Sequence, residues 1–235
     1  MIRLDKFFTE TATLSRKVAC DEIKRGKVLV NGTVVKDSSL KIDETTAKVV
    51  YNGEEVKYQK YVYIMLNKPE GVVSATEDTR QKTVLDLLPE KYKKLGLFPC
   101  GRLDKDTLGL VMLTNDGETA HRLLSPKNHV KKTYKYKCAD PLTDENKIKI
   151  ENGLELRDGY ITKPCNIKVM SPTEGEITLT EGKYHEIKRL FGATHNKITY
   201  LERITFGFLI LDKKLKRGEW RELTADEINH LLKFS

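Results

Sequence analysis

The chain has 235 residues, of which 39% are hydrophobic and 32% are charged, and its formal net charge at pH 7 is +8. This length can bury one sizeable core and a second small one, so we expect a soluble globular protein. The positive charge is spread along the sequence and not held in a tail. It therefore favours a polyanionic partner, with nucleic acid ahead of a membrane surface.

The apolar runs and the cysteines disfavour membrane, secreted and zinc-binding classes. The longest apolar runs, such as residues 61–66, are far short of a spanning helix, and the N-terminus has no signal-peptide core. The cysteines are widely separated, with no CxxC pair and no histidine at zinc-finger spacing: Cys20, Cys100, Cys138 and Cys165. We expect reduced thiols in a cytoplasmic protein without a bound metal.

Residues 1–58 have the pattern of a small α-plus-β domain. Residues 14–26 carry apolar side chains at helical spacing, at Leu14, Val18, Ala19 and Ile23. Asn31-Gly32 and Asn52-Gly53 follow β-branched runs and predict two hairpin turns. The other helix face carries Arg16, Lys17, Lys24 and Arg25, which are either a solvated surface or a contact for a polyanion.

Residues 59–235 alternate short strand patterns with fewer helical ones. The clearest strand patterns are residues 61–67, 109–115, 132–138, 166–170, 175–181 and 206–212. Helical patterns cover residues 117–124, 145–152, 184–192 and 225–233. Because the strands outnumber the helices and lack a regular βαβ alternation, the fold class predicted is α+β with a mostly antiparallel mixed sheet.

The stretch GRLDKDTLGLVMLTNDG, residues 101–117, places Asp104 and Asp106 inside an apolar run. An aspartyl-phosphate signature would read D-x-D-x-T, but Thr107 follows Asp106 directly, and neither a calcium loop nor a glycine-rich phosphate loop is present. Asp104 can cap the following turn. Alternatively, Arg102 and Asp104 project to the same side of an extended segment and form a polar site.

Two basic segments rich in aromatic residues follow, HVKKTYKYK at residues 129–137 and EGKYHEIKRLFG at residues 181–192. Cations interleaved with tyrosine and histidine suit phosphate contacts combined with stacking on exposed bases. The alternative is a basic strand edge that prevents aggregation. The pattern alone does not decide between them.

Three segments together resemble the signature blocks of the RsuA-type pseudouridine synthases in order and spacing. They are LNKPEGVVSAT at residues 66–76, residues 96–134 with the GRLDxxTxGL core, and LTEGKYHEIKRLFG at residues 179–192. Residues 3–32 resemble the S4 RNA-binding domain of the same family. The resemblance covers nearly the whole chain. It implies an S4 domain at residues 1–58 and a catalytic domain at residues 59–235.

The resemblance also implies a role for individual residues. Asp104 would be the catalytic carboxylate, Lys188 the cation that keeps it ionised, and Tyr134 the ring that stacks on the target uracil. Arg102 would occupy the place of a nucleotide flipped out of the RNA. Further RNA contacts implied are Lys131, Lys132 and Arg189, with Leu190 as an apolar wall of the pocket. No cofactor is implied.

Supporting roles are expected for several neighbours. Asn67, Lys68 and Pro69 would brace the cleft, while Asp106 and Thr107 would fix the turn that presents Asp104. Glu186 stands where the family commonly has glutamine. In the S4 domain, the candidate phosphate contacts are Arg3, Arg16, Lys17, Lys24, Arg25 and Lys27.

The function expected is isomerisation of a uridine to pseudouridine in small-subunit ribosomal RNA, by a cytoplasmic monomer. Asp104 would act either by adding to C1′ or by removing a proton from C2′. Large-subunit ribosomal RNA is the alternative target. A catalytically silent RNA-binding or ribosome-assembly protein and a small-molecule phosphatase or glycosidase are the rival interpretations.

Overall fold

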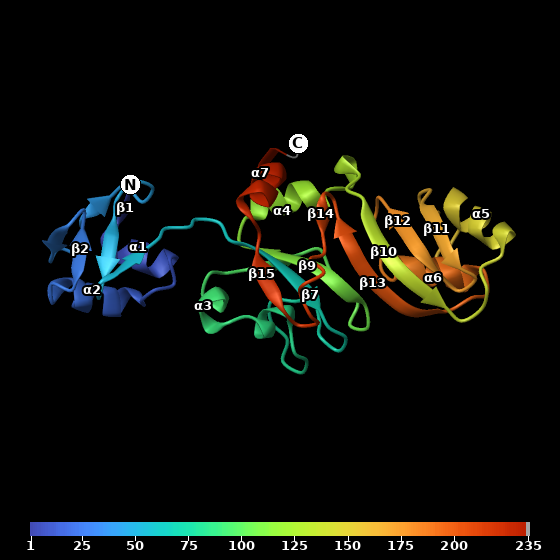
Figure 1. The fold of residues 1–235 in the computed structure, drawn as a ribbon, viewed down its shortest axis with the longest axis horizontal. Coiled ribbons are helices and arrows are strands. Elements are labelled where there is room, and N and C mark those ends of the chain that lie inside the picture. The colour runs from blue at the N-terminus through green and yellow to red at the C-terminus, as the bar shows by residue number, and fades with distance from the viewer. Residues whose placement is uncertain (234–235) are drawn as a thin grey trace. The chain divides into compact units, whose positions relative to one another are not determined.

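A computed structural model describes residues 1–233 (Figure 1). The chain divides into two compact units. The first contains Met1–Val62 together with Leu88–Leu97, and the second contains Tyr63–Leu87 and the chain from Phe98 onward. No helix within residues 1–233 is long and apolar enough to cross a membrane.

Two helices and two small sheets form the main part of the N-terminal unit. Helix α1 is Leu4–Glu10 and α2 is Arg16–Lys24. The larger sheet has the order β3-β2-β5-β6, with strands Thr33–Val35, Val28–Val30, Val49–Tyr51 and Glu54–Val56. Strands β1 (Ile2–Arg3) and β4 (Lys41–Ile42) pair separately. The short helix α3, Glu90–Lys93, belongs to the second segment of this unit.

Both expected hairpin turns are present in this unit. Asn31 and Gly32 have φ of 51° and 82°, and Asn52 and Gly53 have φ of 51° and 86°. Two successive residues with positive φ are what a two-residue turn between twisted strands requires, which explains the Asn-Gly pairs. The helix expected over residues 14–26 is present as α2, whereas α1 was not predicted.

The core of the N-terminal unit lies between the helices and the sheet. Phe7 and Phe8 of α1 and Ile23 of α2 are completely buried. Val18 was expected on the buried face but is 44% exposed. Ser15 caps the helix, and its hydroxyl accepts the Val18 N–H. The buried apolar residues of the helix are Ala19 and Ile23, so fewer of its residues face the core than the pattern indicated.

A single large sheet organises the second unit, in the order β11-β12-β10-β13-β9-β7-β15. These strands are Asn166–Ser171, Glu174–Leu179, Lys132–Cys138, Ile198–Phe206, Leu108–Thr114, Tyr63–Lys68 and Trp220–Glu222. Strand β8 (Phe98–Cys100) pairs with β9, and β14 (Leu209–Ile210) pairs with β13. Only β13 and β9 pair in parallel among the described strands. The α+β class with a mostly antiparallel mixed sheet is therefore confirmed.

Helices lie against this sheet where the sequence predicted them. They are α4 (Gly117–Leu124), α5 (Asp144–Asn152), α6 (Glu186–Ala193) and α7 (Ala225–Lys233), with short 3₁₀ turns at Val84–Leu87 and Pro126–Asn128. Asp116 caps α4 by accepting the Thr119 N–H at 3.1 Å. The Tyr63 hydroxyl donates to the same carboxylate at 2.6 Å, which ties α4 to β7.

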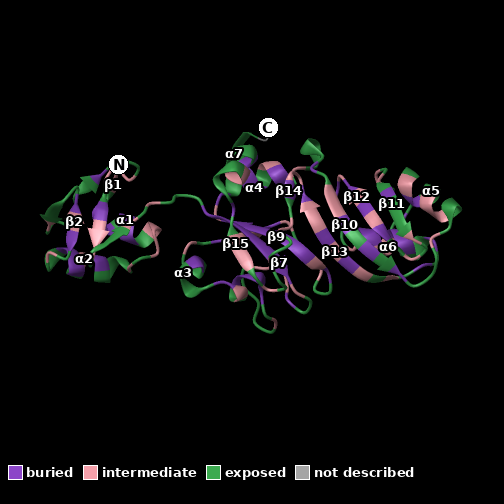
Figure 2. Cartoon of the chain, viewed as in Figure 1, coloured by how far each residue is buried: buried purple, intermediate pink, exposed green. Residues whose placement is uncertain are grey.

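The centre of the sheet is the most deeply buried part of the second unit. Figure 2 shows β7 and β9 buried along almost their whole length. Met65, Leu110 and Met112 from these strands pack into one apolar cluster with Phe206 of β13. A strand whose two faces are both covered carries apolar residues at almost every position, and this pattern made β7 and β9 easy to predict from the sequence.

Strand β13 was not predicted, although it is central. Its sequence, ITYLERITF, includes Glu202 and Arg203, which break the apolar pattern. Gly109 at the start of β9 lies against it with φ of 99°, and a Cβ there would lie only 2.3 Å from the Arg203 carbonyl oxygen. Glycine is therefore required where β9 meets β13, just after residues 101–107.

Candidate active site

Residues 101–107 form the loop between β8 and β9 that carries Asp104. The Thr107 N–H donates to the Asp104 carbonyl at 3.1 Å, which closes a turn. The Ser74 hydroxyl lies 3.1 Å from both the N–H and the carbonyl oxygen of Leu103. The backbone on both sides of Asp104 is therefore fixed by hydrogen bonds.

Lys68 holds the same loop in place through hydrogen bonds to its backbone carbonyls. Its side chain is completely buried, and its ammonium donates to the carbonyls of Pro69 and Lys105 at 3.1 Å and of Thr107 at 2.7 Å. Burial lowers the pKa of Lys68 to about 8, although the charge of Asp106 opposes this shift. Asn67 beside it donates to the Leu215 carbonyl at 2.8 Å. The bracing role expected for this segment agrees with these contacts.

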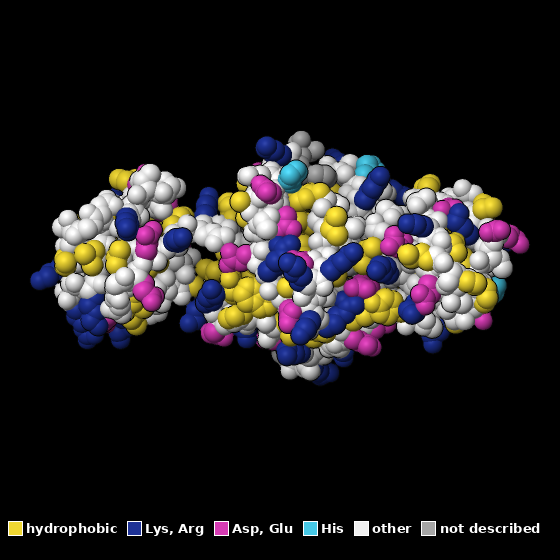
Figure 3. Space-filling view, viewed as in Figure 1, with side chains coloured by type: hydrophobic (Ala, Val, Ile, Leu, Met, Phe, Trp, Pro, Cys, Tyr) yellow, Lys and Arg dark blue, Asp and Glu magenta, His cyan; other side chains and the backbone are white. Residues whose placement is uncertain are grey.

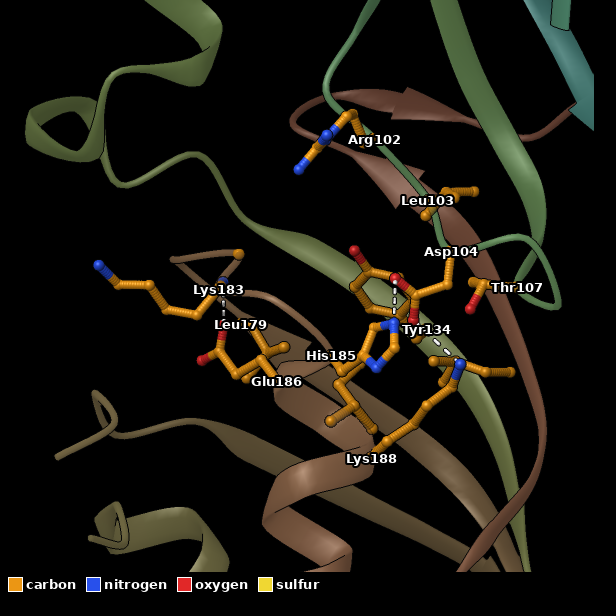
Figure 4. A pocket seen from close by; sticks show the side chains of 13 residues that line it. Arg102, Leu103, Asp104, Thr107, Tyr134, Leu179, Lys183, His185, Glu186 and Lys188 are labelled. Carbon is orange, nitrogen blue, oxygen red and sulfur yellow. Dashed lines mark hydrogen bonds and ion pairs between the residues drawn. The ribbon is translucent and has the colours of Figure 1, made fainter. Parts of the chain in front are cut away.

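Two basic groups from α6 and its N-terminal end lie against the Asp104 carboxylate (Figure 4). The Lys188 ammonium donates to Oδ2 of Asp104 at 3.0 Å. Nε2 of His185 lies 3.4 Å from the other oxygen, Oδ1. Each carboxylate oxygen therefore faces one nitrogen. The carboxyl side chain is nevertheless 24% exposed, so Asp104 is oriented by these groups and is still open to a substrate.

His185 occupies this position because of an unusual backbone conformation. It precedes α6 with φ of 51° and ψ of 31°, in the left-handed region. Its ring stacks on Tyr184, with ring centroids 3.8 Å apart and planes 17° apart. Sequence reasoning did not identify His185 as part of the site, because its role depends on this turn at the start of the helix.

Lys188 is shared between two carboxylates. It also donates to Asp106 Oδ1 at 2.6 Å. Burial lowers the pKa of Lys188, but the hydrogen bonds that it donates to Asp106 and Asp104 outweigh this effect, so the net shift is upward. The pKa of Asp106 is lowered, because its bond with Lys188 outweighs its own partial burial. Asp106 was expected to fix the turn; the backbone does this, and the Asp106 side chain instead holds Lys188.

Tyr134 of β10 forms the floor of the pocket beneath Asp104, and Arg102 stands at its rim (Figure 4). Tyr134 is 8% exposed and lies between Ile177 of β12 and Arg203 of β13 in the sheet register. Arg102 is exposed, and its guanidinium points away from the Asp104 carboxylate. The apolar walls are Leu103, Leu179, Ile187 and Leu201.

Leu190 and Arg189 do not join this pocket. Leu190 is completely buried inside the unit, and Ile187 of the same helix supplies the apolar wall instead. The Arg189 guanidinium pairs with Asp158 and donates to the Tyr184 carbonyl at 3.5 Å. Successive residues on a helix project in different directions, so the neighbours of Lys188 could not share its target.

Glu186 adds a buried carboxyl group to the pocket wall. It is 4% exposed, one of its oxygens accepts the Lys183 N–H at 2.7 Å, and the other has no partner among the described residues. Burial raises the pKa of Glu186 to about 7, and the neighbouring carboxylate of Glu181 contributes in the same direction. Glu186 therefore keeps its proton to a higher pH than an exposed glutamate does.

Most of the candidate RNA contacts in the N-terminal unit are held by buried carboxylates. Arg3 and Arg16 bind Asp5, which is 1% exposed, and Arg25 and Lys27 bind Glu22. The hydrogen bond from Arg3 lowers the pKa of Asp5 to about 2. Lys17 and Lys24 are exposed on α2, where Figure 3 shows Lys and Arg side chains gathered on the N-terminal unit. All six side chains are exposed, and the four that form these ion pairs lie at the outer ends of the pairs.

A known protein family matches the part of the chain that contains Asp104, Tyr134 and Lys188. Residues 62–193 match the family model for RNA pseudouridylate synthase. The chain belongs to the RNA pseudouridine synthase family.

Relatives of this pseudouridine synthase match it over nearly its whole length. A Bacillus subtilis protein named uncharacterized RNA pseudouridine synthase YtzG is 44% identical, with 98% of each chain covered. Ribosomal small subunit pseudouridine synthase A of Escherichia coli is 38% identical, with 97% of this chain and 98% of that protein covered. A solved structure titled crystal structure of pseudouridylate synthase superposes with a TM-score of 0.70 at 36% identity, covering 98% of this chain and 100% of the other.

Proposed function

We propose that this enzyme converts a uridine of small-subunit ribosomal RNA to pseudouridine, with Asp104 as the reacting group. The observation that carries the proposal is the Asp104 carboxylate lying between Lys188 and His185 at the edge of a pocket floored by Tyr134. The reaction needs a carboxylate beside a planar base, and the pocket places the Asp104 carboxylate beside an aromatic ring on which such a base can stack.

Two chemical routes use the same carboxylate. In the first, an Asp104 oxygen bonds to C1′ while the electron pair of the N1–C1′ bond leaves with uracil; the uracil rotates, and C5 bonds to C1′ and releases the carboxylate. In the second, Asp104 takes a proton from C2′ as the N1–C1′ bond breaks, leaving a glycal that accepts C5 at C1′ and a proton at C2′. In both, the C5 hydrogen leaves as a proton at the end.

Lys188 and His185 serve both routes by holding the carboxylate in one orientation. Lys188 stays positively charged at neutral pH, because its pKa is raised. Its ammonium, bonded to one carboxylate oxygen, leaves the rest of the Asp104 carboxylate open toward the pocket. The ring of Tyr134 beneath the carboxylate offers a flat surface on which uracil can stack and rotate.

A uridine inside folded RNA exposes neither C1′ nor C5, so it must leave the stack at a cost of a few kcal/mol. Arg102 stands at the rim of the pocket, exposed and directed away from Asp104. In that position it can occupy the space vacated by the uridine. We assign residues 1–58 as an S4 domain that holds the RNA through phosphate contacts, with the enzyme acting as a cytoplasmic monomer.

The target is assigned to small-subunit ribosomal RNA because relatives of nearly the same length and about 40% identity are named as small-subunit pseudouridine synthases. Carbodiimide-induced stops of reverse transcription, mapped over total ribosomal RNA from strains with and without the gene, test this. One stop should be lost from small-subunit RNA and should return with the wild-type gene but not with Asp104→Asn. Loss from large-subunit RNA would change the target, and no loss in either would favour a silent assembly protein.

A further inference from the structure

A second cavity lies beside the Asp104 pocket, and none of the reaction steps proposed for Asp104 takes place in it. Its volume is about 270 Å³. Arg102, Tyr134 and Lys183 line both cavities, so the two share a wall. A group bound in the second cavity would therefore lie next to a nucleotide whose base rests on Tyr134.

Arg203 of β13 projects its guanidinium to this cavity from inside the sheet. The residue is 1% exposed, its Nε donates to the Leu110 carbonyl at 2.8 Å, and its guanidinium lies 5.1 Å from the centroid of the Phe206 ring. One terminal nitrogen, Nη2, is buried and has no hydrogen-bond partner among the described residues. An arginine kept at this depth with an unused donor is a costly arrangement unless a ligand accepts from it.

The charges around the cavity have one dominant sign. Its lining includes five cationic side chains, from Arg102, Lys132, Lys163, Lys183 and Arg203, and one carboxylate, from Glu181. Both oxygens of Glu181 are already occupied, one by the Tyr160 hydroxyl and the other by the Lys163 N–H at 2.7 Å. The Glu181 carboxylate is thus hydrogen-bonded to other residues of the cavity wall. The cationic side chains outnumber it, so the cavity favours a negatively charged ligand.

Lys132 and Arg203 have an aromatic neighbour in common. Both lie over the Phe206 ring, Lys132 at 5.9 Å and Arg203 at 5.1 Å from its centroid. Burial lowers the pKa of Lys132, and the charge of Arg203 lowers it further. A buried cation and a partly buried cation beside the same ring repel each other, and an anion bound to both would relieve the repulsion.

We propose that this cavity binds a phosphodiester group of the RNA, one of the two that flank the flipped uridine, with Arg203, Lys132 and Lys163 as its cationic partners. A phosphodiester matches the chemistry, because arginine and lysine donate to its oxygens and its single charge needs no metal. The inference rests on the proposed function, since the base in the Asp104 pocket determines which phosphate arrives. The site would hold the sugar while the uracil is detached.

The test replaces single phosphates by neutral methylphosphonates in an RNA fragment that spans the target uridine. Three RNAs carry the change on the 5′ side of that uridine, on its 3′ side, or several nucleotides away. With the full-length wild-type protein, at least one flanking replacement should weaken binding about tenfold more than the distant one, as expected for loss of a charge-assisted contact. Equal losses at all three positions would overturn the proposal.

Lys163→Gln then links the effect to the cavity, and Lys168→Gln, an exposed lysine of β11 outside its lining, is the matched control. In Lys163→Gln the flanking methylphosphonate should weaken binding by clearly less than in the wild type, because one of the three cationic partners of the phosphate is already gone, whereas Lys168→Gln should show the full loss. A full loss in both variants would contradict the proposal. Arg203→Lys repeats the measurement with the buried cation altered, and circular dichroism verifies that the variant is folded.

The affinity comparison tests the phosphate site independently of the proposed catalytic activity. Conversion of the unmodified RNA to pseudouridine by the wild-type protein tests the activity, and the methylphosphonate comparison is read as affinity. An active enzyme with equal losses at all three positions would refute only the phosphate site. An inactive enzyme would refute only the proposed activity.

Discussion

The ammonium group of Lys188 lies 3.0 Å from the Asp104 carboxylate, and the same nitrogen lies 2.6 Å from Asp106. The two aspartates come from one loop and the lysine from α6, so the site exists only when the loop and the helix pack together. The arrangement makes Lys188 both an orienting group and the main positive charge beside the reacting carboxylate.

Lys188→Met should lower the single-turnover rate at least about tenfold, because it removes the hydrogen bond and the positive charge that orient the Asp104 carboxylate. Lys188→Arg should retain more of the rate, since it keeps the charge. The measurement is pseudouridine formation with enzyme in excess over RNA. A Met variant as fast as the wild type would show that Lys188 has no part in the reaction.

The pH dependence follows from the upward shift in the pKa of Lys188. A raised pKa means that the protonated form persists to higher pH than the ordinary value of about 10.4. The wild-type rate should therefore show no loss attributable to Lys188 up to about pH 10. A fall centred below about pH 9 that is absent from Lys188→Arg would contradict the role assigned to the Asp106 and Asp104 contacts.

Arg102→Ala should slow turnover more on structured RNA than on a fragment in which the target uridine is already unstacked. The reason is that Arg102 acts on the flipping step, which costs a few kcal/mol only when the base starts inside a stack. Rates on the two substrates are compared at saturating enzyme. Equal losses on both would argue against a role in flipping.

Glu186→Gln should stabilise the protein above neutral pH. Burial raises the pKa of Glu186 to about 7, so the folded state binds the proton more tightly than the unfolded state does. This group therefore contributes full stability below its unfolded pKa, and that contribution is lost as the pH rises through about 7. The variant should gain on the order of 1–2 kcal/mol at pH 8, a rise of several degrees in Tm, with little change at pH 5.

Thermal unfolding of Glu186→Gln at pH 5 and pH 8, followed by circular dichroism, measures this difference. Glu77→Gln is the control, because Glu77 is exposed in a loop and the same change of charge there should have no comparable effect. Parallel pH dependence in the wild type and Glu186→Gln would contradict the buried-carboxyl interpretation.

Lys17→Gln with Lys24→Gln should weaken RNA binding through α2 while leaving the rate at saturating RNA unchanged. Each lysine that contacts a phosphate contributes about 0.7 to the slope of log affinity against log salt for single-stranded RNA. The double variant should therefore show a shallower salt dependence. Lys48→Gln, whose lysine pairs with Glu55 at 3.7 Å on the sheet, is the control. An unchanged slope in the double variant would remove α2 from the RNA interface.

The elements that the sequence revealed are those with a clear apolar period or a specific turn. Strands β7 and β9 are continuous apolar runs, and the Asn-Gly turns need positive φ that few residues adopt. Strand β13 was missed because Arg203 looks like a surface residue. It is buried with its Nε donating to the carbonyl of Leu110, 93 residues away in the sequence, and a local pattern cannot show such a contact.

The site could be predicted only in part for the same reason. The resemblance to known enzymes pointed to Asp104, Tyr134 and Lys188, and the structure brings these three together. His185 required knowledge of its left-handed backbone, and Leu190 was misplaced because the direction in which α6 faces the pocket is set by tertiary packing. A sequence pattern cannot predict a residue's part in the site when that part depends on how distant segments pack together.

The most direct test of the central claim uses Asp104→Asn on RNA labelled with tritium at C5 of uridine. The C5 hydrogen leaves only when C5 bonds to C1′, so tritium release reports isomerisation itself. The variant should bind the RNA with near wild-type affinity and release no tritium, while the wild type releases it from the target uridine. Tritium release by Asp104→Asn at the wild-type rate would contradict the assignment of Asp104 as the reacting carboxylate.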